Sequence, residues 1–378
     1  MKKWFIILAI SLICSCDRKI EEEEMEMQRQ ADIFREEFVE ALGLKLIDSS
    51  FSLQRGKFKI FGDTLIGANY YSRDMHEETG YIYYKDLRSP QLSHHFDNLP
   101  LNPSDARFDA LQDGHFFLSG RIANLACIIS TTGAYTSLLY NELFHIRKIS
   151  PYRDKFVTID MNSVRVFDKK SRLLFTFKFT DGNVDLAYGV LVGNQFIFVE
   201  NVGIDPGDPS SDSVQNSYSF VHSIDLDSLK IKWEFKYPKG FLDRSNTGET
   251  LYHDEKYLPL HSDSATYFFD WKKGKLEFQL PKSYRVYIGD VGCYLDDYST
   301  PYMAKFDPLR QKILWKSQKM RFGGAYKNYV WGSTSDERHI VVLNANNGKL
   351  MRKIKAPQKG GLIRMAGNYV IVNNIIYQ

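Results

Sequence analysis

The pattern of apolar and polar residues changes once along this chain, near residue 44. In residues 20–43, apolar side chains recur every three or four positions, at Met27, Ala31, Phe34, Phe38, Ala41 and Leu42. This spacing predicts an amphipathic helix, and Gly43 is a suitable C-terminal cap. We expect its apolar stripe to dock on the domain that follows; binding to a partner protein is the alternative.

From residue 44 onward the apolar residues follow a period of two. Short runs such as KFKIFG (57–62), QFIFVE (195–200) and NYVIVN (368–373) alternate with turn residues. Regular short strands of this kind predict an all-β sandwich, barrel or propeller. The length of the region argues against one simple sandwich and favours a repeat.

A turn that recurs along the chain favours a propeller over a sandwich or a barrel. Five copies open with Asp or Asn, at Asp168, Asp225, Asp270, Asp307 and Asn344. Counted from the opening residue, Lys recurs at +5 and an aliphatic residue at +6, and the copy at 168 is one residue shorter. Weaker copies near residues 84 and 130 extend the series, and successive turns lie 37 to 57 residues apart. This period predicts one four-stranded blade per copy.

The predicted fold is therefore an all-β propeller of about eight four-stranded blades, with seven as the alternative. Residues 44–53 and 360–378 supply strands outside the complete repeats. If these N- and C-terminal strands share one blade, the ring closes without open edges.

Each position of the turn has a physical role. The opening Asp or Asn accepts backbone hydrogen bonds, and the glycines at +4, Gly274 and Gly348, can adopt positive φ. The residues at +6 and +8 are two positions apart, so on a strand their side chains lie on the same face. Both are therefore expected to pack against the neighbouring blade. Trp233 and Trp315 occupy +8 and are expected only to pack, whereas Lys at +5 faces water.

This spelling, D-x-x-x-G-K-x-x-W, resembles the repeat of the quinoprotein alcohol dehydrogenase-like (PQQ-like) propellers, a fold group that includes the outer-membrane assembly lipoprotein BamB. The resemblance covers 168–355 well and 57–140 poorly, and Arg352 replaces the aromatic residue in the last copy. Enzymes of this group need a floor for the quinone, a carboxylate base and a Ca²⁺ site, and several also have a vicinal cysteine pair. Cys127 and Cys293 are far apart in sequence and no tryptophan-docking repeat is expected, so we predict no PQQ and no other cofactor.

The N-terminus resembles the signal sequence of bacterial lipoproteins. Lys2 and Lys3 precede an apolar stretch, residues 4–13, that is too short to span a bilayer. Cys16 follows Ser15, so Cys16 rather than Cys14 is the expected lipidated residue; an ordinary cleaved signal is the alternative. We therefore divide the chain into a signal peptide (1–15), an acidic tether and amphipathic helix (16–43) and the propeller (44–378).

The resemblance implies a lipid-anchored protein of the bacterial cell envelope, at the outer membrane on either its periplasmic or its surface side. The acidic run Glu21–Glu24 resembles a surface-export signal, whereas Asp17 after the lipidated cysteine would imply retention at the inner membrane. A solvated tether is the simpler interpretation of the acidic run. The final leaflet therefore stays open.

Composition narrows the function classes. The formal net charge is +3, and removal of Lys2 and Lys3 leaves +1, which gives no basis for nucleic-acid binding. Hydrophobic residues make up 43% and aromatic residues 14% of the chain, enough for a packed core. Cys127 and Cys293 could form a disulfide, although two buried thiols are the commoner arrangement.

Candidate metal ligands are sparse. Asp205, Asp208 and Asp212 share a loop-like insertion (202–217) and are weak Ca²⁺ candidates, because the D-x-D-x-D-G spacing of a calcium loop is missing. The segment 253–255 reads as a solvated turn and the segment 296–297 as a polar loop, and no catalytic residues are assigned. The sequence favours a non-enzymatic envelope lipoprotein that binds envelope proteins, contacts the membrane only through its lipid and binds no nucleic acid. A propeller enzyme or a small-ligand or carbohydrate binder that uses the central channel is the alternative.

Overall fold

The computed structural model describes most of the predicted helix and the strands of each repeat. The described residues are 2–49, 57–74, 77–89, 93–96, 106–110, 116–120, 125–129, 135–139, 148–160, 162–168, 170, 172–179, 188–202, 218–237, 242, 254–262, 264–297, 299–300, 302–318, 320–357, 363–366, 368–373 and 375–378. The chain divides into two compact units. Unit 1 is Met1–Phe51 with Ser299–Gln378, and unit 2 is Ser52–Tyr298.

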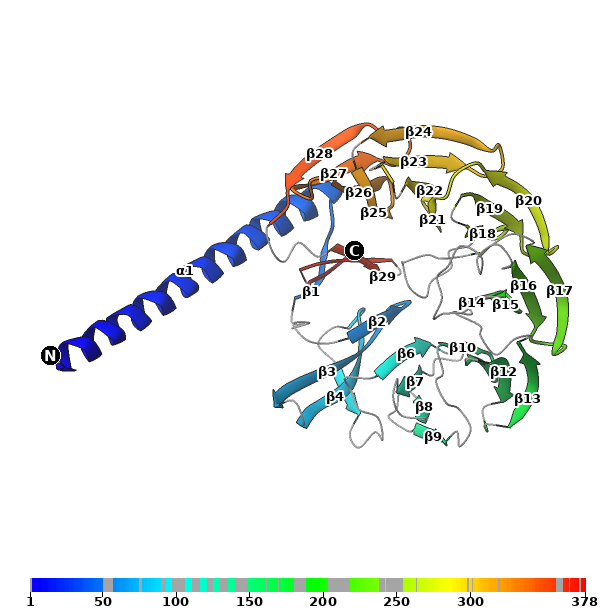
Figure 1. Cartoon of the computed structure of the whole chain (residues 1–378), viewed down its shortest axis with the longest axis horizontal. Coiled ribbons are helices and arrows are strands. Elements are labelled where there is room, and N and C mark those ends of the chain that lie inside the picture. The colour runs from blue at the N-terminus through cyan, green and yellow to red at the C-terminus, as the bar shows by residue number, and fades with distance from the viewer. Residues whose placement is uncertain are drawn as a thin grey trace. The chain divides into compact units, whose positions relative to one another are not determined.

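Unit 2 is built from antiparallel sheets whose strands follow one another in chain order (Figure 1). Its strands are β2 (Lys57–Phe61), β3 (Thr64–Asp74), β4 (Glu77–Asp86), β5 (Ser93–Phe96), β6 (Ala106–Ala110), β7 (Phe116–Gly120), β8 (Leu125–Ile129), β9 (Tyr135–Leu139), β10 (Lys148–Tyr152), β11 (Lys155–Ile159), β12 (Ser163–Asp168), β13 (Leu173–Lys178), β14 (Tyr188–Val192), β15 (Gln195–Val202), β16 (Tyr218–Asp225), β17 (Lys230–Tyr237), β18 (Tyr257–His261), β19 (Thr266–Asp270), β20 (Lys275–Leu280), β21 (Arg285–Gly289) and β22 (Gly292–Asp297). The first strands of successive sheets contact one another, β2 with β6, β6 with β10 and β10 with β14. This is the arrangement of propeller blades, in which the first strand of each blade lies innermost.

Unit 1 contains the helix and the last strands. Its elements are α1 (Lys2–Leu42), β1 (Leu46–Asp48), β23 (Tyr302–Asp307), β24 (Lys312–Gln318), β25 (Met320–Tyr326), β26 (Tyr329–Thr334), β27 (His339–Asn344), β28 (Leu350–Lys355), β29 (Ile363–Ala366), β30 (Tyr369–Val372) and β31 (Ile375–Tyr377). Strand β1 pairs with β31, in a sheet ordered β1-β31-β30-β29. Strands from the two ends of the chain therefore share one sheet.

The prediction of an all-β propeller of four-stranded blades is confirmed. Among the described residues, seven sheets have four strands each, the number of blades that the seven-blade alternative expects. One further sheet, β18-β19-β20, has three described strands.

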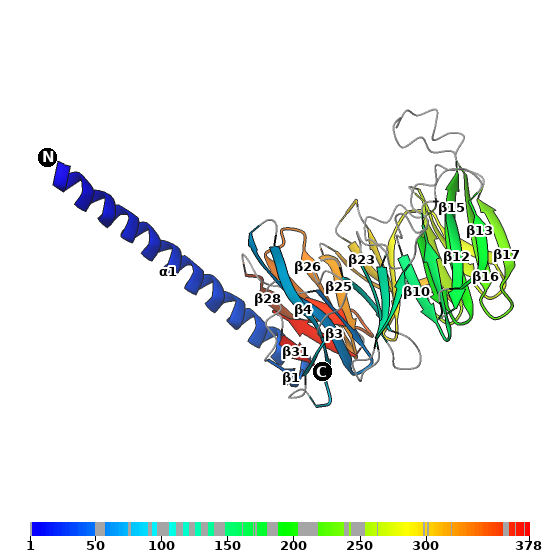
Figure 2. The same ribbon diagram turned by 90° about the horizontal axis from the view of Figure 1, so that it is seen from below.

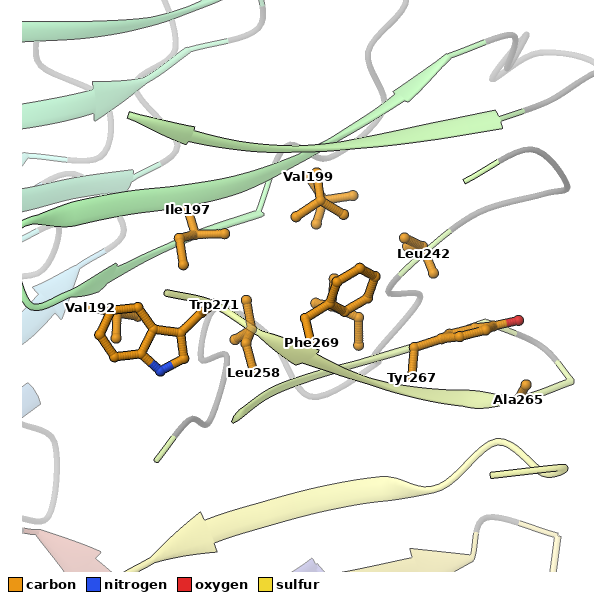
Figure 3. Packing of buried hydrophobic residues seen from close by; sticks show 11 residues of the cluster. Val192, Ile197, Val199, Leu242, Leu258, Ala265, Tyr267, Phe269 and Trp271 are labelled. Atoms are coloured by element: carbon orange, nitrogen blue, oxygen red, sulfur yellow. The ribbon is translucent and has the colours of Figure 1, made fainter. Parts of the chain in front are cut away.

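Burial is greatest along the second strand of a sheet and lowest along its outer strand. Every residue of β15 and of β19 is buried, whereas exposed and half-buried residues alternate along β20. The apolar core lies between successive sheets. Figure 3 shows one such layer, where Ile197 and Val199 of β15 face Leu258 of β18 and Phe269 of β19.

The helix α1 docks through the stripe that the sequence predicts. Phe34, Phe38 and Leu42 are buried against side chains of the two neighbouring sheets β25–β28 and β29–β31. Phe38 meets the edge of Trp331 at a ring-centroid distance of 5.5 Å. The described part of the chain contains no helix with both the length and the hydropathy needed to cross a bilayer.

One prediction about the repeat is wrong: the aliphatic residue at +6 is not packed in most copies. The exposed fraction is 39% for Ile231, 40% for Ile313 and 64% for Leu350. In all five copies a β-bulge follows the turn. It lies between +6 and +8 in four copies, for example where Ser223 pairs with Trp233 but Ile224 pairs with Ile231, and between +5 and +7 in the shorter copy at 168. A bulge adds one residue to the strand and breaks the strict alternation on which the prediction rested.

Candidate functional site

The turn-opening residues lie at the end of the strand that precedes each outer strand. In every copy the side-chain oxygen Oδ1 accepts hydrogen bonds from backbone N–H groups of the turn. Asp225 accepts from Asp227 and Ser228, both at 2.9 Å, and Asn344 accepts from Asn346 at 2.9 Å and from Asn347 at 3.3 Å. Asp168, Asp270 and Asp307 accept equivalent bonds. These residues fix the turn and leave few acceptor positions for a ligand.

The +4 position is left-handed whether or not it is glycine. Gly274 and Gly348 have φ of 65° and 69°, and Leu229 and Gln311 occupy the same position in other copies with φ of 55° and 52°. The backbone conformation is thus a property of the turn rather than of glycine. A second requirement must explain why two copies keep glycine.

That requirement is a tryptophan from the preceding sheet. A Cβ on Gly274 would overlap the indole of Trp233, and a Cβ on Gly348 would lie 2.7 Å from Cδ2 of Trp315. Both indoles also donate a hydrogen bond to the carbonyl at +1 of the same turn, Trp233 to Trp271 (3.0 Å) and Trp315 to Ala345 (3.1 Å). The prediction that these tryptophans only pack is corrected: each one docks on the next turn through a hydrogen bond as well.

The other predicted site residues fall in different places. Cys16 lies within α1, and Asp205, Asp208 and Asp212 lie outside the described residues. Cys293 is a buried free thiol whose pKa is raised by burial, and Cys127 lies on β8. The described side chains include no group of three His, Cys, Asp or Glu residues placed to hold a metal ion.

The polar turns have structural partners. Asp254 accepts the backbone N–H of Lys256 at 2.7 Å, as a turn cap does. The expectation of a polar loop at 296–297 is wrong, because Asp296 and Asp297 lie at the end of β22 and are buried. The Lys282 ammonium pairs with the Asp297 carboxylate. Burial also raises the pKa of the Tyr294 hydroxyl.

The strongest ionisable cluster was not found in the sequence. On β15, β16 and β17, which lie side by side in Figures 1 and 2, Glu200, His222 and Glu234 form a row. His222 Nε2 lies 2.9 Å from Oε2 of Glu200, and its Nδ1 lies 2.9 Å from Oε2 of Glu234. Glu200 is 0% exposed and His222 2%, while the Glu234 side chain is 49% exposed.

Aromatic rings cover this cluster. The His222 ring lies 4.6 Å from the ring of Phe177 and 4.9 Å from that of Phe198, measured between centroids. A buried carboxylate is costly unless it is paired, so the imidazole compensates Glu200. Glu200 lies two residues before the end of β15, and the insertion 202–217 connects β15 to β16 in the sequence. A hint was present in the sequence: Glu200 ends the apolar run QFIFVE, two residues before the insertion 202–217 begins.

Comparisons with known proteins support the fold alone. No protein-family model matches the chain, and no curated protein matches it. Among solved structures, the chain is similar to the computationally designed protein Ika8, with a TM-score of 0.56 and 12% identity over 85% of this chain and 94% of that one. It is also similar to the dihydro-heme d1 dehydrogenase NirN, with a TM-score of 0.52 and 12% identity over 77% of this chain and 66% of that one. AztD from Citrobacter koseri has a TM-score of 0.46 and 14% identity over 82% of this chain and 85% of that one.

Proposed function

We propose that the chain is a non-enzymatic lipoprotein of the bacterial cell envelope, anchored at the outer membrane through Cys16. Its propeller would be a rigid scaffold that binds another envelope protein. The resemblance of the leader to a lipoprotein signal and of the repeat to PQQ-like propellers supports this proposal.

The observation that carries the proposal is the docking of α1. From Cys16 to the buried Leu42, α1 is one uninterrupted helix, which spans about 39 Å at about 1.5 Å per residue. Because Phe34, Phe38 and Leu42 fix its end against the sheets of unit 1, a lipid on Cys16 would be joined to the propeller by a helix and not by a loose tether. Such a connection suits a scaffold held at a defined distance from a lipid surface.

Metabolic labelling with a palmitate analogue tests the anchor. Cys16→Ala should abolish incorporation, while Cys14→Ala, two residues away, should retain it. Incorporation that persists in Cys16→Ala, or is lost only in Cys14→Ala, contradicts the assignment.

Cross-linking of the tagged full chain in native envelope membranes tests the scaffold. We expect one or a few defined envelope proteins to be recovered in stoichiometric amounts. The matched control is the Cys16→Ala chain, in which recovery should fall because the protein is no longer held at the membrane. A chain that stays monodisperse and recovers no defined partner contradicts the scaffold.

The buried row Glu200–His222–Glu234 favours a second candidate, a propeller that binds a small ligand or acts as an enzyme. Under this alternative the ligand is bound in the central channel, and Asp205, Asp208 and Asp212 stay weak Ca²⁺ candidates from the sequence alone. Calorimetric titration of the full chain with Ca²⁺ and with neutral and acidic sugars tests it. Saturable binding that is lost in Asp208→Asn or His222→Gln would support this candidate over the scaffold.

A further inference from the structure

Two outer strands of unit 1 form a surface that is both basic and apolar. The segments 308–318 and 345–357, which contain β24 and β28, include seven Lys and Arg residues and no Asp or Glu. Arg310, Lys312 and Lys316 of the first segment are exposed, as are Lys349, Arg352, Lys353 and Lys355 of the second. We call these two segments the basic edge.

Aliphatic side chains lie among these charges. The bulges at +6 and +7 expose Ile313 and Leu314 on β24, and Leu350 and Met351 on β28. The two strands belong to successive sheets that Trp315 joins by docking on Gly348 and Ala345. The corresponding +7 residues on β17 and β20 are charged, Lys232 and Glu277. An exposed aliphatic pair is thus present on both strands of the basic edge and on β13, where Leu173 and Leu174 are 55% and 39% exposed, but not on β17 or β20.

The complementary surface lies on α1 of the same chain. Glu22, Glu23, Glu24 and Glu26 are exposed, and the exposed fraction of Met25 between them is 65%. We call residues 22–26 the acidic segment. It combines carboxylates with an uncovered apolar side chain, as the basic edge combines cations with uncovered aliphatic side chains.

One ion pair within the chain already joins a carboxylate of α1 to a cation of the basic edge. The Arg352 guanidinium lies 3.5 Å from the Glu40 carboxylate, where α1 contacts β28. Glu26 lies fourteen residues before Glu40, about 21 Å along the helix axis. The acidic segment therefore cannot reach Arg352 of its own chain, but the helix of another copy can.

We propose that the chain self-associates, with the acidic segment of one copy bound to the basic edge of a second copy. Opposite charges set the pairing, and Met25 adds apolar contact with the bulge residues. If the pairing is reciprocal, each copy contributes one helix and one edge, which gives a closed symmetric dimer. This inference does not depend on lipidation of Cys16 or on a protein partner.

The experiment measures the molar mass of the full chain in a non-ionic detergent by light scattering, with the detergent contribution subtracted. At about 10 mM salt, where the Debye length is about 30 Å, the mass should be twice that of one chain; at about 1 M, where it is about 3 Å, most of the protein should be monomeric. Reversal of the helix (E22K, E23K, E24K and E26K) and of the edge (K312E, K316E and K353E) should each give monomers. A mixture of the two reversed chains, and one chain that carries both reversals, should associate again.

Two controls keep the result interpretable. Reversal of Lys230, Lys232 and Lys275, on outer strands of unit 2, should leave the dimer intact. If a reversed chain fails to fold by circular dichroism, glutamine substitutions at the same positions remove the charge instead, and should also give monomers.

Several results would overturn the proposal. A mass that is equal in all variants would show that detergent or other surfaces cause the association. A doubly reversed chain that stays monomeric would show that the two surfaces do not pair. If edge reversal leaves the mass unchanged but abolishes sedimentation with vesicles rich in phosphatidylglycerol, the basic edge binds anionic lipid instead.

Discussion

The indole of Trp315 covers Gly348, the left-handed turn residue of the following sheet. Its Nε1 donates to the Ala345 carbonyl at 3.1 Å, and a Cβ on Gly348 would lie 2.7 Å from the ring. Trp233 repeats the relationship with Gly274 and the Trp271 carbonyl. A side chain of one sheet therefore fixes the turn of the next, and the turn geometry and the packing between sheets depend on each other.

Gly348→Ala should destabilise unit 1 by about 2–4 kcal/mol, since the left-handed conformation costs about 1 kcal/mol and overpacking adds about 1–3. Gly62→Ala is the matched control. Gly62 has a φ of 57°, and a Cβ at this position would have nothing within 4 Å, so the variant should lose only the backbone contribution. Denaturant unfolding of both variants measures the difference; equal losses would show that the indole contributes nothing.

The repeat made the blades predictable, because the turn spelling and the apolar period both depend on local chain geometry. The docking stripe of α1 was predictable for the same reason. The orientation of Ile231, Ile313 and Leu350 was not predictable. A bulge depends on how two strands pair, and the residue pattern of one strand alone does not indicate it.

The row Glu200–His222–Glu234 was not predictable either. Its members lie 22 and 12 residues apart in sequence, on three strands that the antiparallel register brings side by side. Each of the three residues, taken by itself, is an ordinary residue of its strand. A sequence without the register cannot show that they meet.

Asp225 should make unit 2 sensitive to acid. The backbone N–H of Ser228 holds the pKa of the Asp225 carboxyl below its ordinary value, burial opposes this, and the N–H of Asp227 adds to it. A carboxyl whose pKa is lowered by folding stabilises the protein above its unfolded pKa of about 3.9, and that stability is lost as pH falls through the lower, folded value. Asp225→Asn should therefore flatten the decline of stability below about pH 4.

Asn344 shows that a neutral side-chain oxygen can accept the same turn bonds. Asp225→Asn should accordingly fold and lose only about 0.5–1.5 kcal/mol at pH 7. The converse variant, Asn344→Asp, should add acid sensitivity to unit 1. Urea unfolding at several pH values between about 2 and 7 measures both slopes, and an unchanged slope in Asp225→Asn would contradict the assignment.

Glu200 and His222 should be energetically coupled. His222→Leu leaves the buried Glu200 carboxylate without its imidazole partner, and should cost about 3–5 kcal/mol. The double variant Glu200→Met/His222→Leu should lose less than the sum of the single losses, with a coupling of about 0.5–3 kcal/mol. Urea unfolding of the four proteins gives this coupling directly.

Glu234→Gln is the control for that cycle, because the Glu234 side chain is half exposed. The Glu234 carboxylate keeps contact with water, and glutamine retains the side-chain oxygen, so this variant should change the free energy of unfolding by no more than about 1 kcal/mol. Additive losses for Glu200 and His222 would mean that the two residues stabilise the blade independently.

Phe38 should decide whether α1 stays attached to the sheets. Its side chain is fully buried between Phe34 and Trp331, with ring centroids 6.1 and 5.5 Å away. Phe38→Ala removes these contacts and should cost about 3–5 kcal/mol, whereas Ile33→Ala on the exposed face should stay within about 0.5 kcal/mol.

Because the lost contacts join α1 to the sheets, the loss should appear as release of the helix before the sheets unfold. Hydrogen exchange and limited proteolysis should show residues 22–42 exposed in Phe38→Ala and protected in Ile33→Ala. Global unfolding with no separate release of the helix would show that α1 is an integral part of the fold. The helical connection from Cys16 to the propeller includes this aromatic contact. If Phe38→Ala releases the helix, it also removes the rigid connection on which the proposed scaffold depends.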